Sequence, residues 1–255
     1  MSGTRCEGPR QRMEAEGMSE YHVVSLSGGK DSTAMLLMMH ERGMRIDEVV
    51  FADTGMDFPQ MHDHIARIER TVGMPVTVVK HELGFEHMML DHVLAKGKRQ
   101  GERCYGWPRL NARWRTSKLK TDLIAAYFAE LRKTHDVVQY VGIAADEAHR
   151  AKGERYPLVE WGVTEAEALR YCYERGFDWS GLYGMFNRVS CWCCPFQGIP
   201  ELRTLRRNFP DLWQKLLDMD ERAFNTFRID YTARQLEERF AAEDRQLRID
   251  FEEVT

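Results

Sequence analysis

Short runs of β-branched and apolar residues alternate with stretches of helical periodicity in the first part of the chain. Runs of strand length occur at 21–26, 47–55, 75–82 and 136–143. Apolar residues recur at helical spacing at 31–43, 58–73 and 115–135. Strands that alternate with helices are typical of a parallel sheet with helices on both faces. We therefore predict an α/β fold whose ligands bind at the carboxyl ends of the strands.

The rest of the chain has a different pattern and completes the predicted organisation. Residues 1–20 are rich in Gly, Glu, Arg and Gln without apolar periodicity, which predicts a disordered leader. Whether Met1 or Met18 is the start stays open. The α/β domain is expected to span 21–160, a helical C-terminal region 161–228, and a charged tail 229–255.

Composition narrows the class of protein. The 255 residues are 43% hydrophobic with a formal net charge of -4, which gives no overall attraction to nucleic acid or an anionic membrane. No apolar stretch approaches the ~20 residues that cross a bilayer, and the leader lacks the apolar segment of a secretion signal. These features predict a soluble cytoplasmic protein with no membrane partner. Its oligomeric state stays open.

The segment Ser27-Gly28-Gly29-Lys30-Asp31-Ser32 lies where the first strand turns into the first helix. The unpaired amides at the start of that helix, its dipole and Lys30 favour a bound phosphate. Glycines allow close approach of the backbone to the anion, and Ser27 and Ser32 carry hydroxyl donors. The spacing is not that of a Walker A loop. The alternative is an ordinary glycine turn with a Ser or Asp helix cap.

The same segment resembles the SGGxDS signature of the PP-loop pyrophosphatase superfamily, whose members act at the α-phosphate of an adenine nucleotide. Within it, the chain is most similar to the phosphoadenosine phosphosulfate (PAPS) reductase family. The resemblance also rests on the segments 51–60, 142–150, 156–161 and 182–196. It implies that 21–160 is a PP-loop nucleotide-binding domain of the adenine nucleotide alpha hydrolase-like fold, with ATP or PAPS as ligand.

Carried over residue by residue, the resemblance implies a nucleotide site with two further segments. Asp53, Thr54 and Gly55 match the turn that lies beside the nucleotide after the second strand. Gly142, Asp146, Glu147 and Arg150 fit the pattern after the fourth strand, where Ala144 replaces the usual arginine. Lys30, Asp31 and Arg150 are the expected catalytic residues, and the expected nucleotide-binding residues are Ser27, Gly28, Gly29, Lys30, Asp31, Ser32, Asp53, Thr54, Gly55, Gly142, Glu147 and Arg150.

Cysteines form a second candidate site. Cys191, Cys193 and Cys194 lie within four residues, and Cys104 is a candidate fourth ligand from another segment. Four thiolates can hold Zn²⁺ or an iron–sulfur cluster, although the C-x-C-C spacing also allows packing cysteines or a reactive dithiol. The resemblance favours a cluster, since several branches of the family carry one. Cys6 and Cys172 are read as bystanders.

Two features favour ATP over PAPS. Reductases of the family attack the sulfonucleotide with a cysteine near the C-terminus, and here no cysteine follows Cys194. ATP-splitting relatives usually have a lysine in the loop, as Lys30 here. The resemblance thus implies Mg²⁺-dependent cleavage of ATP to AMP and pyrophosphate, coupled to sulfur transfer from a sulfur donor, or else reduction of a sulfonucleotide by a reductant.

A basic segment at 96–120 is a candidate nucleic-acid contact. Tyr105, Trp107 and Trp114 are interleaved with its cations, as in surfaces that stack bases. A solvated loop is the alternative, and so are the nucleotide's own phosphates. The cations are Lys96, Lys98, Arg99, Arg103, Arg109, Arg113, Arg115, Lys118 and Lys120, against the single acid Glu102. The histidines at 62, 64, 81, 87 and 92 are read as surface or packing residues.

Three functional hypotheses follow. The first is a nucleotide-dependent sulfur enzyme, and the second is an enzyme that thiolates a nucleic acid. The third is a catalytically inactive nucleotide-sensing or nucleic-acid-binding module in which the cysteines hold structural zinc.

Overall fold

The computed structural model describes residues 19–95, 100–101 and 104–252, with side chains described as far as residue 246. Most of the predicted leader, Met18 and Cys6 lie outside the described residues. The same holds for Lys96, Lys98, Arg99, Glu102 and Arg103 of the basic segment.

Four strands form one parallel sheet, as predicted. They are β1 (Glu20–Leu26), β2 (Glu48–Asp53), β3 (Val76–Lys80) and β4 (Asp136–Val141). Their order across the sheet is β3-β2-β1-β4. In the register, Leu26 pairs with Phe51 and Asp53 with Lys80, so the carboxyl ends of these strands share one edge.

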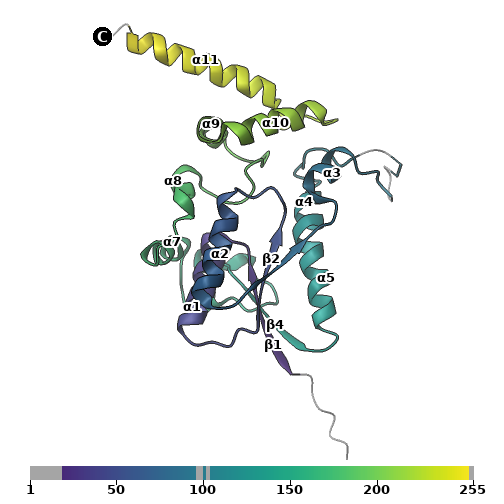
Figure 1. Ribbon diagram of the computed structural model, residues 1–255, viewed down its shortest axis with the longest axis vertical. Coiled ribbons are helices and arrows are strands. Elements are labelled where there is room, and N and C mark those ends of the chain that lie inside the picture. Colours follow the sequence, from purple (N-terminus) through teal and green to yellow (C-terminus); the bar gives the residue numbers. More distant parts are fainter. Residues whose placement is uncertain (1–18, 96–99, 102–103, 253–255) are drawn as a thin grey trace, which may run out of the picture.

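Helices cover both faces of the sheet (Figure 1). The face with Val24, Leu26 and Phe51 packs in the main core, together with α1 (Lys30–Glu41) and α2 (Gln60–Val72). On the other face, Val23 and Val50 pack against Phe128 of α5 (Asp122–Leu131). The alternation of buried side chains along each strand therefore supplies two apolar layers.

The long helix predicted at 115–135 is broken near its start. It consists of α4 (Trp114–Thr116), the π-helical turn η1 (Ser117–Thr121) and then α5. The Thr121 hydroxyl donates to the Thr116 carbonyl over 3.2 Å, which gives that carbonyl a side-chain partner at the irregular turn.

Short helices connect the sheet to a C-terminal helical layer. They are α3 (Gly84–Leu90), η2 (Ala145–Arg150), α6 (Pro157–Glu160), α7 (Glu165–Glu174), η3 (Trp179–Gly181) and α8 (Leu182–Met185). The layer itself contains α9 (Ile199–Asn208), α10 (Pro210–Arg222) and α11 (Ala233–Glu252). The segment predicted as a charged tail thus includes a 20-residue helix.

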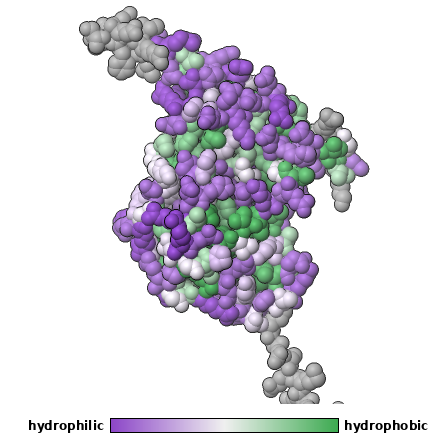
Figure 2. Space-filling model, in the orientation of Figure 1, coloured by the Kyte–Doolittle hydropathy of each residue, from purple (hydrophilic) through white to green (hydrophobic). Residues whose placement is uncertain are grey.

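The C-terminal helices share the main hydrophobic core with the sheet. Leu205, Trp213 and Phe240 belong to the same buried cluster as Val24 and Met35. Their outer surface is mostly hydrophilic (Figure 2). None of the helices in the described part of the chain combines the length and apolar content that a bilayer crossing needs.

Candidate functional site

The strand order places the candidate site at a switch point of the sheet. From β1 the chain adds β2 and β3 on one side, and β4 then pairs with β1 on the other. Such a reversal leaves a crevice at the carboxyl ends of the two strands, where α/β proteins bind their ligands. The loop Ser27–Ser32 follows β1, and the segment Gly142–Arg150 follows β4, so the structure brings together two of the three predicted segments.

Hydroxyl groups within the loop fix its shape. The Ser27 amide donates to Ser32 Oγ over 3.1 Å, and Ser32 Oγ in turn donates to the Gly29 carbonyl at the same distance. Ser27 Oγ lies 2.9 Å from Ser32 Oγ. Ser32 is buried, so its hydroxyl closes the loop rather than pointing to a ligand.

Aromatic residues from a distant part of the chain hold the loop from outside. The Lys30 amide donates to the Tyr183 hydroxyl over 2.8 Å, and the Trp179 indole donates to the Gly28 carbonyl over 2.7 Å. The Trp179 ring stacks on His64, whose Nε2 is 3.0 Å from Thr33 Oγ1. Sequence reasoning assigned no role to Trp179 and Tyr183, and only the run of aromatic residues near them hinted at packing.

At two positions in or beside the loop, neighbouring atoms lie too close for any residue with a Cβ. A Cβ at Gly142 would lie 2.5 Å from Ser32 Cα and 2.6 Å from its amide nitrogen, so only glycine lets β4 pass this close to the start of α1. Gly28 has φ +76°, and a Cβ there would lie 2.3 Å from Met61 Sδ. Both predicted glycines therefore shape the loop.

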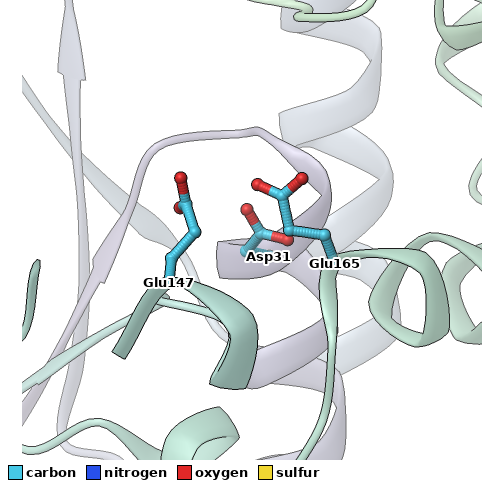
Figure 3. A group of neighbouring side chains, drawn as sticks. All are labelled: Asp31, Glu147 and Glu165. Carbon is cyan, nitrogen blue, oxygen red and sulfur yellow. The ribbon is translucent and has the colours of Figure 1, made fainter. Parts of the chain in front are cut away.

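Three carboxylates lie together at the start of α1, and two of them contact the Lys30 side chain. Asp31, Glu147 and Glu165 each place an oxygen within 4.8 Å of the other two. They come from α1, η2 and the first residue of α7, and their side chains point toward one another (Figure 3). Lys30 Nζ lies 3.5 Å from Asp31 Oδ1 and 3.4 Å from Glu165 Oε2.

Burial and neighbouring negative charges both raise the pKa of Asp31. Burial raises the pKa of Asp31, and Glu165 and Glu147 raise it further, against the opposing charge of Lys30. Its buried Oδ1 forms an ion pair with Lys30 Nζ at 3.5 Å but makes no hydrogen bond. Asp31 therefore has an oxygen that can accept a cation or a proton.

Glu165 lies beside Lys30 in the candidate site, although the sequence did not indicate it. It lies 134 positions from Asp31, and no spacing pattern connects the two. Its amide donates to Asp146 Oδ1 over 3.1 Å, which ties the start of α7 to η2. Arg150, expected to contact phosphate, forms an ion pair with Glu147 and has a side chain that is 53% exposed.

In the turn after β2, the Asp53 carboxylate is already hydrogen-bonded to groups of the protein. Asp53 Oδ1 accepts from the Gly55 amide over 2.7 Å, and Oδ2 accepts from Lys80 over 2.9 Å. Burial opposes ionisation of Asp53, but these two hydrogen bonds outweigh it and lower its pKa. Thr54 donates to Asp57 over 2.8 Å and lies 3.7 Å from Cys191 Sγ, so the turn meets the cysteine segment.

The four predicted metal ligands do not form a compact set. No three of the sulfur atoms of Cys104, Cys191, Cys193 and Cys194 lie within 4.8 Å of one another, because the carboxylates at Lys30 are the only such group of His, Cys, Asp or Glu among the described residues. Sulfurs around one Zn²⁺ lie about 3.8 Å apart, from Zn–S bonds of about 2.3 Å. The predicted metal site stays a prediction, which iron and zinc analysis of anaerobically purified protein tests.

The half-buried Arg115 lies beside these thiols. Burial opposes charge on Arg115, but the neighbouring Cys191, Cys193 and Cys194, with Asp57, raise its pKa. Burial raises the pKa of the Cys191 and Cys193 thiols. Both thiols are therefore protonated at neutral pH in this arrangement.

Most aromatic residues of the basic segment belong to the core. Trp107 and Trp114 are buried, and Trp114 stacks on Phe85 with ring centroids 5.3 Å apart. They are therefore not exposed to stack on bases. Arg109 donates to the carbonyls of Thr226 and Phe227. It therefore ties the segment to the chain that precedes α11.

The buried His64 beneath the loop predicts a pH-dependent stability. Burial, followed by the charge of Arg67, lowers the pKa of His64 to about 4 from 6.5. The unfolded chain binds a proton as the pH falls below 6.5, and the folded chain does so only near 4. Stability therefore falls with pH in this interval, by about 2 kcal/mol between pH 7.5 and 5.0.

Urea unfolding of the wild type and of His64→Gln at pH 7.5 and 5.0 measures this contribution. The variant should lose less stability than the wild type on acidification, whereas His40→Gln, at an exposed histidine, should match the wild type. Equal losses in all three proteins would show that His64 does not titrate as described. Glu41 does not interfere with this measurement between pH 7.5 and 5.0. Hydrogen bonds from Arg175 and Tyr171 lower the pKa of Glu41 to about 2, so its contribution to stability is lost only below pH 4.5.

Most of the chain is similar to known proteins. The family model of the phosphoadenosine phosphosulfate reductase domain matches residues 21–197, which include the loop, both further segments and the cysteines 191, 193 and 194. A crystal structure of PAPS reductase from Candida auris, in complex with phosphate, matches with a TM-score of 0.47 at 16% identity, over 71% of this chain and 84% of that chain.

Two uncharacterized proteins of Methanocaldococcus jannaschii are also similar. One is 27% identical over 216 residues, 76% of this chain and 40% of its own length. The other is 22% identical over 212 residues, 78% of this chain and 47% of its own length. The chain thus spans less than half the length of these curated relatives.

Proposed function

Because the chain belongs to the phosphoadenosine phosphosulfate reductase domain family, we propose that it is an enzyme that acts on an adenine nucleotide in sulfur chemistry. The reaction we propose is cleavage of ATP between the α- and β-phosphorus atoms. It yields pyrophosphate and an adenylated acceptor, and attack by a sulfur nucleophile on that acceptor then releases AMP.

The observation that carries this proposal is the position of Lys30. Its ammonium group lies at the start of α1, at the switch point of the sheet, where it pairs with Asp31 and Glu165. A cation there can stabilise the negative charge that builds up on a leaving pyrophosphate. A sulfonucleotide reaction needs no such stabilisation of pyrophosphate, so the arrangement favours ATP over PAPS.

The loop supplies further groups for the same anion. The amides of Asp31 and Ser32 have no hydrogen-bond partner among the described residues and lie in the first turn of α1. They can donate to phosphate oxygens, and the helix dipole adds to the attraction. Arg150 can turn from Glu147 to a phosphate, since its side chain is more than half exposed.

The carboxylate group fits Mg²⁺. Asp31, Glu147 and Glu165 offer oxygen ligands, and the buried Asp31 Oδ1 makes an ion pair with Lys30 but no hydrogen bond. When bound with ATP, Mg²⁺ neutralises charge on the pyrophosphate leaving group. Lys30 would then be free to turn from these carboxylates toward the nucleotide.

Sulfonucleotide reduction has less support from the thiols. It requires a thiolate that attacks the sulfur atom. Burial raises the pKa of Cys172 to about 12, and it also raises those of Cys191 and Cys193. The arrangement of the cysteines does not fit a tetrahedral metal site, so no step of the proposed reaction passes through a metal at these residues.

The identity of the products tests the proposal. With Mg²⁺ and a suitable acceptor, ATP should give AMP and pyrophosphate. Release of sulfite from PAPS at a comparable rate, with ATP unchanged, would instead indicate a reductase.

A further inference from the structure

A cavity of about 530 Å³ lies against the cysteine segment, apart from the loop Ser27–Ser32. The chain around 108–116 forms one wall and the chain around 187–201 the other. Three arginines line it, namely Arg113, Arg115 and Arg188. Neither the family resemblance nor the proposed reaction assigns a role to these arginines.

The positive charge of the cavity is not matched by its walls. Its one acidic wall residue, Glu201, balances only one of the three arginine charges. The Glu201 carboxylate accepts hydrogen bonds from the Asn187 amide over 3.0 Å and from the Gly198 amide over 3.1 Å, not from these arginines. Arg115 Nη1 is buried without a hydrogen-bond acceptor. Burying a guanidinium nitrogen without an acceptor destabilises the protein, because the N–H group loses its hydrogen bonds to water. A bound anion would supply the missing acceptor.

Several arginines in the described part of the chain pair with carboxylates. Arg206 binds Glu237 over 2.7 Å and Asp244 over 2.6 Å. By contrast, no carboxylate in the described chain comes within 4.0 Å of the guanidinium nitrogens of Arg113, Arg115 or Arg188.

The other walls define the size and character of the ligand. Apolar walls come from Leu110 and Phe196, and the Arg113 guanidinium lies 5.7 Å from the Phe196 ring centroid. Cys191 and Cys194 face the same space, and Cys191 Sγ lies 3.7 Å from Thr54 at the carboxyl edge of the sheet. A volume of this order is typical of small-molecule sites.

We propose that this cavity binds a small molecule through a phosphate or sulfate group. Three guanidinium groups match the charge and planar donor geometry that such oxyanions require. If the proposed function holds, the molecule is the second substrate, held between the cysteines and the nucleotide site. Anion binding by the cavity does not itself depend on the proposed function.

Alkylation of Cys194 reports on this cavity locally, because its thiol is half-buried in the wall while Cys191 and Cys193 are buried. Uncharged iodoacetamide is the reagent, and the Cys194 peptide is quantified by mass spectrometry. Inorganic phosphate or sulfate, tested separately at millimolar concentration, should slow the reaction several-fold, whereas chloride at equal ionic strength should not. Comparison of the two anions shows which group is preferred.

Variants show whether the arginines cause the protection. Arg113→Gln/Arg188→Gln alters two exposed side chains, so the fold should persist, and protection should be lost. Arg115→Met should also weaken it. Arg234→Gln removes one exposed positive charge on α11 and should keep full protection. No protection in the wild type, or equal protection in the double variant, would overturn the proposal.

Two further arms separate this proposal from neighbouring ones. A single-stranded oligonucleotide that protects Cys194 at micromolar concentration, where phosphate and sulfate do not at millimolar, would overturn the small-molecule class. Nucleotide affinity is measured on the wild type alone. A failure of ATP to bind would therefore refute the proposed function. The Cys194 protection assay would still show whether the cavity binds an anion.

Discussion

Gly142→Ala is expected to destabilise the protein and abolish nucleotide binding. The added Cβ would lie 2.5 Å from Ser32 Cα, 2.6 Å from the Ser32 nitrogen and 2.9 Å from the Asp31 carbonyl carbon. These are backbone atoms of the first turn of α1, so the clash is relieved only if the strand and the helix separate. We expect a loss of about 3 kcal/mol and a fall of about 5–10 °C in the unfolding midpoint.

Gly184→Ala is the matched control. It lies in α8, where an added Cβ would meet no atom within 4 Å, so its midpoint should stay at the wild-type value or rise slightly. Differential scanning calorimetry and ATP titration measure both variants. If Gly142→Ala has the same unfolding midpoint and the same ATP affinity as Gly184→Ala, the end of β4 does not lie as close to the loop as described.

Lys30→Ala is expected to have the largest effect on the reaction. Loss of a charge-assisted contact to phosphate should weaken ATP binding about 10-fold or more. If the contact strengthens as the pyrophosphate leaves, turnover should fall on the order of 10²-fold. The side chain is only 15% exposed and its ammonium group pairs with Asp31 and Glu165, so the unfolding midpoint should fall as well, and affinity is measured at a temperature where calorimetry shows the variant folded.

Calorimetric titration with ATP and Mg²⁺ checks the effect of Lys30→Ala on affinity. Lys133 is an exposed lysine just after the end of α5, where it pairs with Glu130. Lys133→Ala removes an equal charge and should bind ATP as the wild type does. Equal affinity and equal turnover in Lys30→Ala and the wild type would remove Lys30 from the site.

The fold and the loop could be predicted because their signals are local. The runs that became β1 to β4 are short, apolar and separated by helical periodicity, so the sheet and its ligand edge followed from neighbouring residues. The glycines and Lys30 of the loop lie in one stretch of six residues. The predicted roles of these residues in binding and catalysis stay predictions.

The partners of the loop could not be predicted because they are distant in sequence. Glu165, Trp179 and Tyr183 reach the loop only after the chain has crossed the sheet and added α7, η3 and α8. A lone glutamate at a helix start, or a tryptophan in an aromatic segment, is equally consistent with a surface or a core position.

The cysteines and the basic segment show a different limit. Spacing in the chain did not reveal whether the sulfurs of Cys191, Cys193 and Cys194 converge, since that depends on backbone directions. Charge counting likewise did not reveal that Trp107 and Trp114 are buried. Arg115, counted as part of a nucleic-acid contact, instead lies beside the thiols.

Product analysis with two nucleotides distinguishes cleavage of ATP from reduction of a sulfonucleotide. Purified protein is incubated with Mg²⁺ and either ATP or PAPS, with reductant, a sulfur donor and candidate acceptors, and Lys30→Ala serves as the blank. Nucleotides and pyrophosphate are separated by chromatography, and sulfite is measured in parallel. We expect AMP and pyrophosphate in equal amounts from ATP, dependent on Mg²⁺ and on Lys30, with little sulfite from PAPS. Sulfite release from PAPS with ATP intact, or ADP and phosphate as the products of ATP, would contradict this expectation.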